Sequence, residues 1–225
     1  MPISAMGTYW PTIKRLIEAK PSSILEIGSG SGRYGMSIRD FLEDICYGND
    51  PTDPSTWKIR LEGVEIWEPN LRAPAHGFYY NETHLADGRD FLKDAARDGK
   101  TWDCVTAIDV VEHVPFDDAV AMVDNMLQVA ESYVLVATPY GKHLQDDKFG
   151  NPYEVHQFTL YEDFFDRWLP RLEQLWRVDN CMLAVLWGKN PSGLPPPKAD
   201  VFQVVDMLRD SRLRVHRGMK LRGEK

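Results

Sequence analysis

Acidic side chains stand at or near the end of short apolar runs at four places in this chain, where they could bind a cation. These residues are Glu26, Glu65, Asp87 and Asp109, and each run reads as a buried strand. If the strands are parallel, their carboxyl ends meet at one edge of a sheet, where ligands bind in open α/β folds. Carboxylates gathered there attract a positively charged ligand and repel a pyrophosphate.

Glycines alternate with other residues directly after Glu26. The segment 24–35 reads Ile-Leu-Glu-Ile-Gly-Ser-Gly-Ser-Gly-Arg-Tyr-Gly. Glycine has no Cβ and tolerates positive φ, so a strand can turn sharply into a helix while a ligand lies against the main chain. Part of the segment also fits the dinucleotide pattern G-x-G-x-x-G, which is weak evidence by itself. Glu26, two residues before the first glycine, favours a ligand that carries an ammonium and a sulfonium.

The pattern Glu-x-Gly-x-Gly-x-Gly at residues 26–32 resembles motif I of the class I S-adenosylmethionine-dependent methyltransferases. A second segment, Asp-Val-Val-Glu-His at 109–113, resembles the DVxEH motif of small bacterial and phage members of that class. The resemblance covers about residues 20–190 and implies S-adenosylmethionine as the cofactor. The cofactor-binding residues that it implies are Glu26, Gly28, Ser29, Gly30, Gly32, Glu65, Ile66, Asp87, Gly88, Asp109 and Val110.

Two of these acids receive specific roles. Glu65 ends the second predicted strand, where a carboxylate can accept both hydroxyls of a ribose, a device that NAD enzymes share. It follows Gly28 by 37 positions instead of the usual ~20, and a polar loop over 47–56 accounts for the excess. The resemblance implies that Asp87 accepts a hydrogen bond from the adenine 6-amino group. Taken alone, either Asp87 or Asp90 fits the cap of a helix.

Two histidines, His113 and His156, are the candidates for a catalytic general base. His113 ends the DVxEH motif, and His156 ends a segment that resembles the "TPxG … Q … GNPxxxH" loop of a bacterial and phage methyltransferase subgroup. Such a loop would lie over the transferred methyl group, and general-base help is worth ~10²–10⁴-fold in rate. A surface histidine in a structured loop explains His156 equally well. We expect no metal site, because Glu112 and His113 lack the H-E-x-x-H spacing and the six histidines are otherwise scattered.

Alternating strand-like and helix-like segments must position these groups. The sequence predicts an α/β fold with a doubly wound, mainly parallel, seven-stranded sheet, Rossmann-like as in methyltransferases, and an antiparallel edge hairpin. Predicted strands are 23–27, 59–66, 83–86, 104–108, 133–137, 175–178 and 182–187; predicted helices are 9–19, 32–46, 88–97, 116–130 and 160–168. We expect residues 1–190 to form the methyltransferase domain, and 191–225 to form a Pro-rich linker, a C-terminal helix and a basic tail.

Composition restricts the partners and the compartment. The chain has 225 residues, a net charge of −8 and three cysteines without pair spacing. No apolar run approaches the roughly 20 residues of a membrane span, and no secretory signal is visible, so we expect a cytoplasmic protein. The acidic body and the missing DPPY-type tetrad argue against DNA. Residues 211–225 hold six Lys or Arg and one Glu, a tail that could contact an acidic partner.

The predicted function is transfer of a methyl group from S-adenosylmethionine to an oxygen or nitrogen of a small-molecule or glycan-like acceptor. Aromatic residues in the loops 47–56, 67–80 and 140–158 are consistent with such an acceptor, although they serve equally well as loop anchors. Two alternatives stay open at this stage. One is a catalytically inactive methyltransferase-like binding subunit, and the other is an NAD-dependent oxidoreductase, which the absence of a Tyr-x-x-x-Lys pair disfavours.

Overall fold

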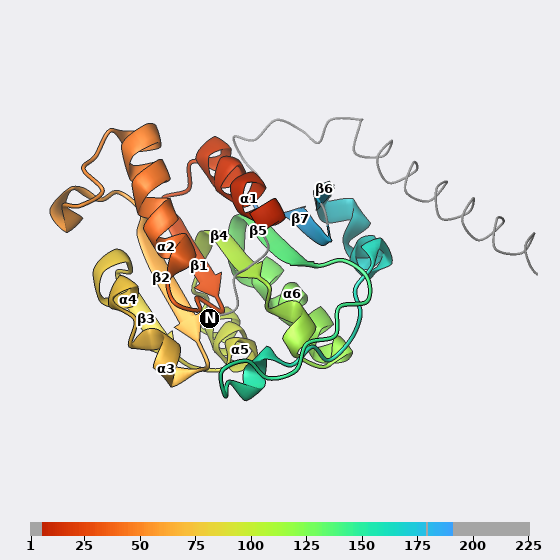
Figure 1. The fold of residues 1–225 in the computed structure, drawn as a ribbon. Coiled ribbons are helices and arrows are strands. Elements are labelled where there is room, and N and C mark those ends of the chain that lie inside the picture. Colours follow the sequence, from red (N-terminus) through yellow and green to blue (C-terminus); the bar gives the residue numbers. More distant parts are fainter. Residues whose placement is uncertain (1–5, 179, 191–225) are drawn as a thin grey trace, which may run out of the picture.

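A computed structural model describes residues 6–178 and 180–190, and the predicted tail therefore lies outside the described residues. One sheet has the strand order β3-β2-β1-β4-β5-β7-β6 (Figure 1). Its strands are β1 Ser23–Ile27, β2 Arg60–Glu65, β3 Glu82–Leu85, β4 Trp102–Ile108, β5 Ala130–Pro139, β6 Leu172–Val178 and β7 Cys181–Trp187. The first five strands are parallel, whereas β7 runs antiparallel to both β5 and β6. The predicted fold is confirmed.

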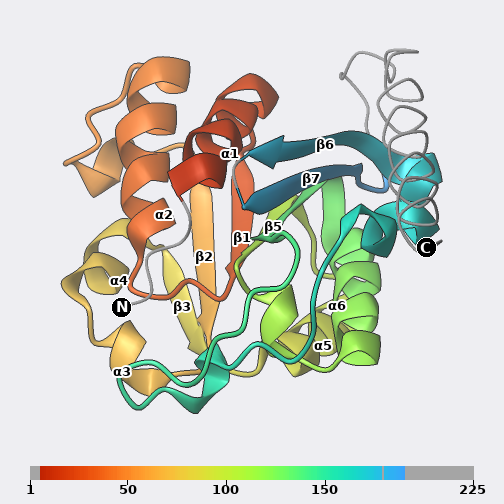
Figure 2. The ribbon, with the colours of Figure 1, turned by 45° about the vertical axis from the view of Figure 1, so that its right-hand side comes forward.

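Helices cover both faces of the sheet (Figures 1 and 2). The α-helices are α1 Met6–Ala19, α2 Arg33–Ser37, α3 Glu68–Leu71, α4 Pro74–Tyr79, α5 Gly88–Arg97 and α6 Phe116–Val129. A π-helix, η1 Ile38–Tyr47, continues α2, and the 3₁₀ segments are η2 Pro54–Thr56, η3 Val111–His113, η4 Pro152–Glu154 and η5 Glu162–Arg171. α1 and η1 pack on one face, and α5, α6 and η5 pack on the other. None of the helices in the described ranges is long and apolar enough to cross a bilayer.

Burial on both faces explains why the central strands are nearly continuous apolar runs. Every residue of β1 is buried. Successive side chains of a strand point to opposite faces, so Leu25 and Ile27 join the core beside α5 and α6 while Ile24 joins the core beside α1 and η1. Glu26 shares the face of Ile24, and its carboxyl contacts Tyr80, which belongs to the same core.

Apart from shifted strand ends and the 3₁₀ form of η5, which was predicted as a helix over 160–168, the structure departs from the predicted elements in two places. The segment 32–46 was predicted as one α-helix. The structure has a short α-helix there that continues as the π-helix η1, with i→i+5 hydrogen bonds. The segment after β2 was predicted as an irregular connection but holds α3 and α4. Each of these helices has one proline, at its first or second position. Proline is compatible with the first turn of a helix because the missing N–H has no partner there.

Candidate functional site

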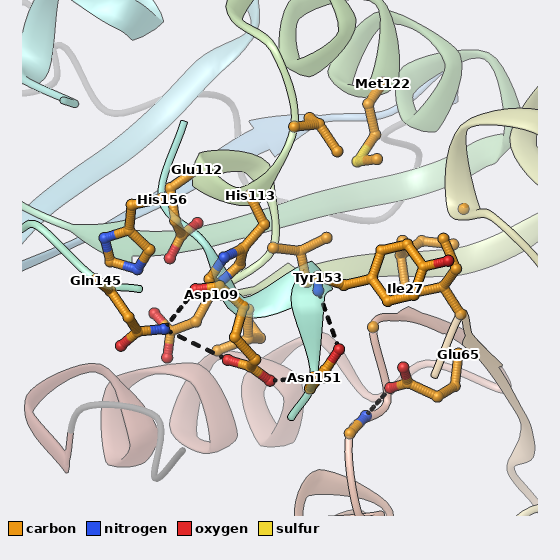
Figure 3. Close-up of a pocket in the computed structure, with 18 of the residues that line it drawn as sticks. Ile27, Glu65, Asp109, Glu112, His113, Met122, Gln145, Asn151, Tyr153 and His156 are labelled. Carbon is orange, nitrogen blue, oxygen red and sulfur yellow. Dashed lines mark hydrogen bonds between the residues drawn. The ribbon is translucent and has the colours of Figure 1, made fainter. Parts of the chain in front are cut away.

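A cavity of about 580 Å³ opens at the carboxyl ends of the central parallel strands (Figure 3). It lies where the strand order reverses between β1 and β4, the position at which doubly wound sheets bind ligands. One end of the cavity is lined by the glycine loop and the tips of β1 and β2. The other end is lined by η3 and the loop between β5 and η5, including Glu112, His113, Gln145 and His156.

The glycine loop leaves its main chain open to this cavity. Gly28 has a φ of +71°, and a Cβ built on it would lie 2.4 Å from Cγ2 of Val110. Gly30 has a φ of +57°, yet a Cβ there would meet no atom within 4 Å, because the cavity occupies that space. A side chain at Gly28 would therefore disturb the packing of the loop, while one at Gly30 would take space from a ligand.

Glu65 holds the glycine loop as well as lining the cavity. Its Oε2 accepts a hydrogen bond from the Gly30 backbone N–H at 2.7 Å, and its Oε1 accepts one from the Trp67 N–H at 2.7 Å. The side chain is buried, and that burial raises the pKa of Glu65 above its ordinary value. The carboxyl thus already has partners on both oxygens, and a ribose diol would share or replace them. Sequence reasoning gave Glu65 only the ligand role.

Glu26, Ser29 and Gly32 do not line the cavity. Glu26 is 2% exposed and accepts a hydrogen bond from the Tyr80 hydroxyl at 2.6 Å. Burial raises the pKa of Glu26 to about 8, so the carboxyl is mostly neutral at pH 7. It therefore supplies little negative charge for a cation, contrary to the electrostatic reasoning from the sequence. Any contribution of Glu26 to cofactor binding acts through the position of the glycine loop, and that role stays a prediction.

Asp87 and Gly88 line the cavity at the start of α5. Asp87 caps this helix by accepting a hydrogen bond from the Arg89 N–H at 2.9 Å, so the cap is Asp87 and not Asp90. The Arg89 guanidinium binds the same carboxylate, with Nη2 2.6 Å from Oδ2. These hydrogen bonds lower the pKa of Asp87. An adenine amino group at Asp87 would have to share the carboxylate with Arg89. Ile66 and Val110 form apolar parts of the cavity wall.

A backbone turn at Asp109 presents the second half of the DVxEH segment to the cavity. Asp109 has a φ of +54°, which is uncommon for a residue with a side chain. The turn leads into η3, whose Glu112 and His113 line the cavity. Glu112 is 2% exposed, and its Oε2 accepts a hydrogen bond from the Thr138 hydroxyl at 3.2 Å. Burial, reinforced by the charge of Asp109, raises the pKa of Glu112 well above its ordinary value.

The two candidate bases meet although 43 positions separate them in the sequence. The ring centroids of His113 and His156 are 4.9 Å apart. Nδ1 of His113 lies 3.3 Å from the Val155 carbonyl oxygen, and Nδ1 of His156 lies 2.7 Å from that of His143. A carbonyl only accepts, so each Nδ1 carries the hydrogen and each Nε2 keeps its lone pair. Burial lowers the pKa of His113 to about 4 and also lowers that of His156.

Backbone and amide contacts fix the loop that carries His156. The N–H of Gln157 donates to the Glu112 carbonyl at 2.8 Å, which ties the loop directly to η3. Gln145 Nε2 donates to the Glu154 carbonyl at 2.8 Å, and Asn151 Oδ1 accepts from the Tyr153 N–H at 3.0 Å. Sequence reasoning quoted these residues within the loop motif but gave Gln145 and Asn151 no role. The sequence signal for a structured loop was the pair of amide side chains with Gly150 between them.

A family model described as "Methyltransferase domain" matches residues 7–176. This span includes the glycine loop, η3 and the histidine pair. The chain belongs to the methyltransferase domain family. Membership confirms the prediction of an S-adenosylmethionine-dependent methyltransferase and sets aside the oxidoreductase alternative. Assignment to the small bacterial and phage group with the DVxEH motif stays a prediction. The comparison with curated proteins found no match.

Solved methyltransferase structures share the fold of this chain. A complex of DhpI with SAH is 17% identical, with a TM-score of 0.57, and the match covers 83% of this chain and 86% of that one. Magnesium protoporphyrin IX methyltransferase from Synechocystis PCC 6803 with bound SAM is 12% identical, with a TM-score of 0.53 and coverages of 81% and 78%. An O-methyltransferase family protein from Burkholderia thailandensis is 10% identical, with a TM-score of 0.54 and coverages of 81% and 57%.

Proposed function

We propose that this methyltransferase moves a methyl group from S-adenosylmethionine to an oxygen or nitrogen of a small-molecule or glycan-like acceptor. One observation carries the proposal: a single cavity extends from the glycine loop to the histidine pair. The glycine-loop end would hold the donor, and the histidine end would hold the acceptor. A volume of about 580 Å³ lies within the range of ordinary small-molecule sites.

The glycine-loop end fits an adenosyl group. The open space above Gly30 admits a ligand against the main chain, and the Glu65 carboxylate lies next to it, where it can accept hydrogen bonds from a diol. Ile66 and Val110 offer apolar wall for a base or a thioether. When bound, S-adenosylmethionine supplies a methyl group on a sulfonium sulfur, and the electron pair of the broken C–S bond stays on that sulfur as a neutral thioether.

The chain's own contribution at the other end is orientation and proton removal. Holding the acceptor in line with the methyl group converts an encounter into a positioned step. The acceptor atom also loses a proton, and the neutral Nε2 of His156 or His113 can take it. With a pKa of about 4, His113 is a weak base at neutral pH, so we assign this role first to His156. Tyr153 lines the cavity beside Ile27, and its ring packs against that of Trp67 with centroids 6.2 Å apart, an aromatic wall that suits a flat or glycan-like acceptor.

Donor binding tests the proposal without knowledge of the acceptor. Calorimetry of the full chain with S-adenosylhomocysteine and with NADH should show binding of the first and none of the second. The Glu65→Ala variant should bind S-adenosylhomocysteine at least tenfold more weakly, because it loses the diol acceptor and the Gly30 contact together. Glu68→Ala is the matched control, since Glu68 is an exposed neighbour that forms an ion pair with Arg72. Equal affinities of the two variants would contradict the ribose assignment.

Acceptor identity requires turnover. A screen for transfer of a labelled methyl group to sugar nucleotides and small phenols should find an acceptor in one of these classes. The same assay separates an active enzyme from an inactive binding subunit, because only an active chain consumes the donor.

A further inference from the structure

Three side chains of metal-ligand type meet at the acceptor end of the cavity. Glu112, His113 and His156 each offer one ligand atom, and these atoms all lie within 4.8 Å of one another (Figure 3). η3 supplies the first two residues, and the loop that Gln157 ties to Glu112 supplies the third. The fold therefore joins two residues of the DVxEH segment to a third from a loop far along the chain.

Both imidazoles are oriented as metal ligands are. Each donates its Nδ1 hydrogen to a backbone carbonyl, at 3.3 Å for His113 and 2.7 Å for His156, and this fixes the tautomer with a free lone pair on Nε2. Metal-binding histidines almost always have such a carbonyl or carboxylate partner on the other ring nitrogen. Two adjacent histidines with the same tautomer offer two nitrogen ligands to one ion.

Glu112 gives an independent indication of a ligand. In the described part of the chain, its Oε1 is buried and has no hydrogen-bond partner, while the residue lines the cavity. A buried polar atom without a partner costs free energy, and most buried side-chain oxygens in proteins have one. A cation held between Glu112 and the two histidines would supply the missing partner.

A second cluster shows the contrast. Glu62, Glu82 and His84 also lie within ligand distance of one another. Glu62, however, accepts hydrogen bonds from Trp102 Nε1 at 3.1 Å and contacts His84 Nε2 at 3.3 Å, and it also pairs with Arg60. Because protein groups already bind both oxygens of Glu62, this cluster needs no ion to satisfy them.

We propose that Glu112, His113 and His156 bind one divalent transition-metal ion, which holds a hydroxyl acceptor through its oxygen. Two imidazole nitrogens and one carboxylate oxygen suit Mn²⁺, Fe²⁺, Co²⁺ or Zn²⁺. Three protein ligands leave positions open toward the cavity, as in catalytic metal sites. An acceptor with a second oxygen on the neighbouring atom would fill two of them. This inference rests on the proposed function for the acceptor and changes the histidines from bases to ligands.

The ion would replace the general base. A metal ion lowers the pKa of a bound water, and it would lower the pKa of a bound hydroxyl in the same way. The acceptor's proton then passes to water, the acceptor oxygen forms the bond to the methyl carbon, and the C–S electron pair stays on sulfur. The step is redox-neutral, so any of the four ions could support it.

Metal binding by the untagged full chain tests the proposal without an acceptor. After treatment with EDTA and its removal, the chain is titrated with Mn²⁺, and loss of the free-ion electron paramagnetic resonance signal reports binding. We expect one Mn²⁺ per chain, with binding at least tenfold weaker in Glu112→Gln and in His156→Ala. His84→Ala, in the second cluster, is the control and should bind within twofold of the wild type. His156→Gln, which keeps side-chain bulk, replaces His156→Ala if that variant does not fold.

Binding of S-adenosylhomocysteine, measured on the same samples, reports folding and separates the two proposals. A chain that binds S-adenosylhomocysteine but no Mn²⁺, Co²⁺ or Zn²⁺ would overturn the metal site and leave the methyl-transfer proposal standing. A chain that binds one metal ion but not S-adenosylhomocysteine would overturn the methyl-transfer proposal and leave the metal site standing. Unchanged Mn²⁺ affinity in folded Glu112→Gln and His156 variants, or loss of binding in His84→Ala alone, would also overturn the site.

Discussion

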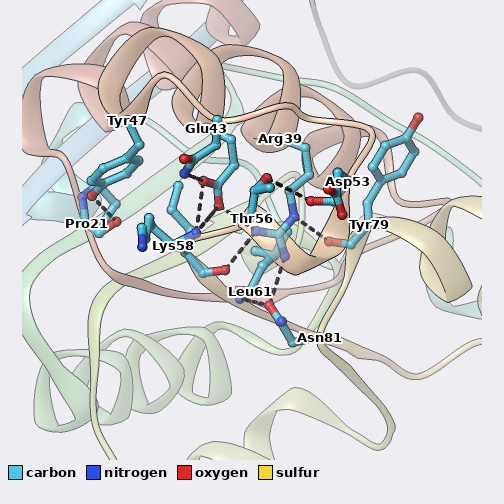
Figure 4. A network of polar contacts seen from close by, with 12 residues as sticks. Pro21, Arg39, Glu43, Tyr47, Asp53, Thr56, Lys58, Leu61, Tyr79 and Asn81 are labelled. Carbon is cyan, nitrogen blue, oxygen red and sulfur yellow. Dashed lines mark hydrogen bonds and ion pairs between the residues drawn. The ribbon is translucent and has the colours of Figure 1, made fainter.

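Two buried glutamates, Glu43 and Glu112, differ in how the protein satisfies them. Glu43 is 0% exposed and lies in a polar network between η1 and the start of β2 (Figure 4). Its carboxylate pairs with Arg39 at 3.1 Å and accepts hydrogen bonds from the backbone N–H groups of Lys58 and Ile59. The carboxyl of Glu112 has one hydroxyl donor on Oε2, at 3.2 Å.

The partner of Glu43 is equally well satisfied. Arg39 donates to the carbonyls of Tyr79 and Ile59 at 2.8 Å each and to Asn81 Oδ1 at 2.8 Å. Its guanidinium also lies 3.8 Å from the ring centroid of Trp57. A buried charge with this many partners belongs to the structure, whereas Glu112 keeps an oxygen without a partner beside the cavity, as the proposed metal site requires. Glu43 is thus a structural carboxylate, and Glu112 is the one we propose to be functional.

The largest expected effect comes from the structural glutamate. Glu43→Gln removes the charge opposite a buried guanidinium and places an NH₂ donor among N–H donors. Breaking a buried ion pair in this way costs about 3–5 kcal/mol, so the free energy of unfolding in urea should fall by that amount. The exposed pair Arg72–Glu68 gives the control, since Arg72→Ala should cost no more than about 0.5 kcal/mol. A loss below about 1 kcal/mol for Glu43→Gln would contradict the structural role.

Glu26 lies between these two cases. Its buried carboxyl has one hydroxyl donor, and its pKa is raised. Its pKa is about 8 in the folded chain against an ordinary value of 4.5. The unfolded state therefore releases this proton first, and the free energy of unfolding decreases as the pH rises from about 4.5 to 8, by at most ~1.4 kcal/mol per pH unit. Below pH 4.5 the carboxyl is neutral in both states and adds no pH dependence.

Glu26→Gln should remove that part of the slope. We expect the variant to gain about 3–4 kcal/mol relative to the wild type between pH 5 and pH 8, as measured by urea unfolding at both values. Glu18→Gln, at an exposed position on α1, should leave the slope unchanged. Parallel pH curves for the wild type and Glu26→Gln would show that Glu26 titrates normally in the folded chain.

The smallest effect is expected for the same substitution at the functional glutamate. Glu112→Gln keeps the shape of a buried carboxyl whose pKa is raised by burial and whose Oε1 has no partner in the described part of the chain. Its free energy of unfolding in EDTA should stay within about 1 kcal/mol of the wild type. Added Mn²⁺ should stabilise the wild type but not the variant, because only the wild type binds the ion. Equal losses for Glu43→Gln and Glu112→Gln in EDTA would erase the distinction between the two sites.

The sequence predicted the fold well because its strands are short apolar runs separated by clear breaks. Ser23–Ile27 was predicted at the observed bounds. η1 was predicted as an α-helix, since the apolar spacing of a π-helix over ten residues is close to the α period. α3 and α4 were missed because the prolines in their first turns read as loop signals.

The site was easiest to predict where one strand end carries one residue. Glu65, Asp87 and Asp109 all line the cavity as expected, because parallel strands end at one edge. The burial of Glu26 follows from the alternation of side chains along β1, which the electrostatic reasoning did not apply. The meeting of Glu112 with His156 depends on a loop of irregular backbone, so a search for local metal-binding spacing could not find it.

A crystal structure of the full chain with S-adenosylhomocysteine and Mn²⁺ tests the central claim of one cavity with a donor end and a metal-binding acceptor end. We predict the adenosine against Gly30 and Glu65, and an anomalous difference peak between Glu112, His113 and His156. S-adenosylhomocysteine bound away from the glycine loop, or Mn²⁺ bound elsewhere while these three residues keep their metal-free contacts, would contradict the account.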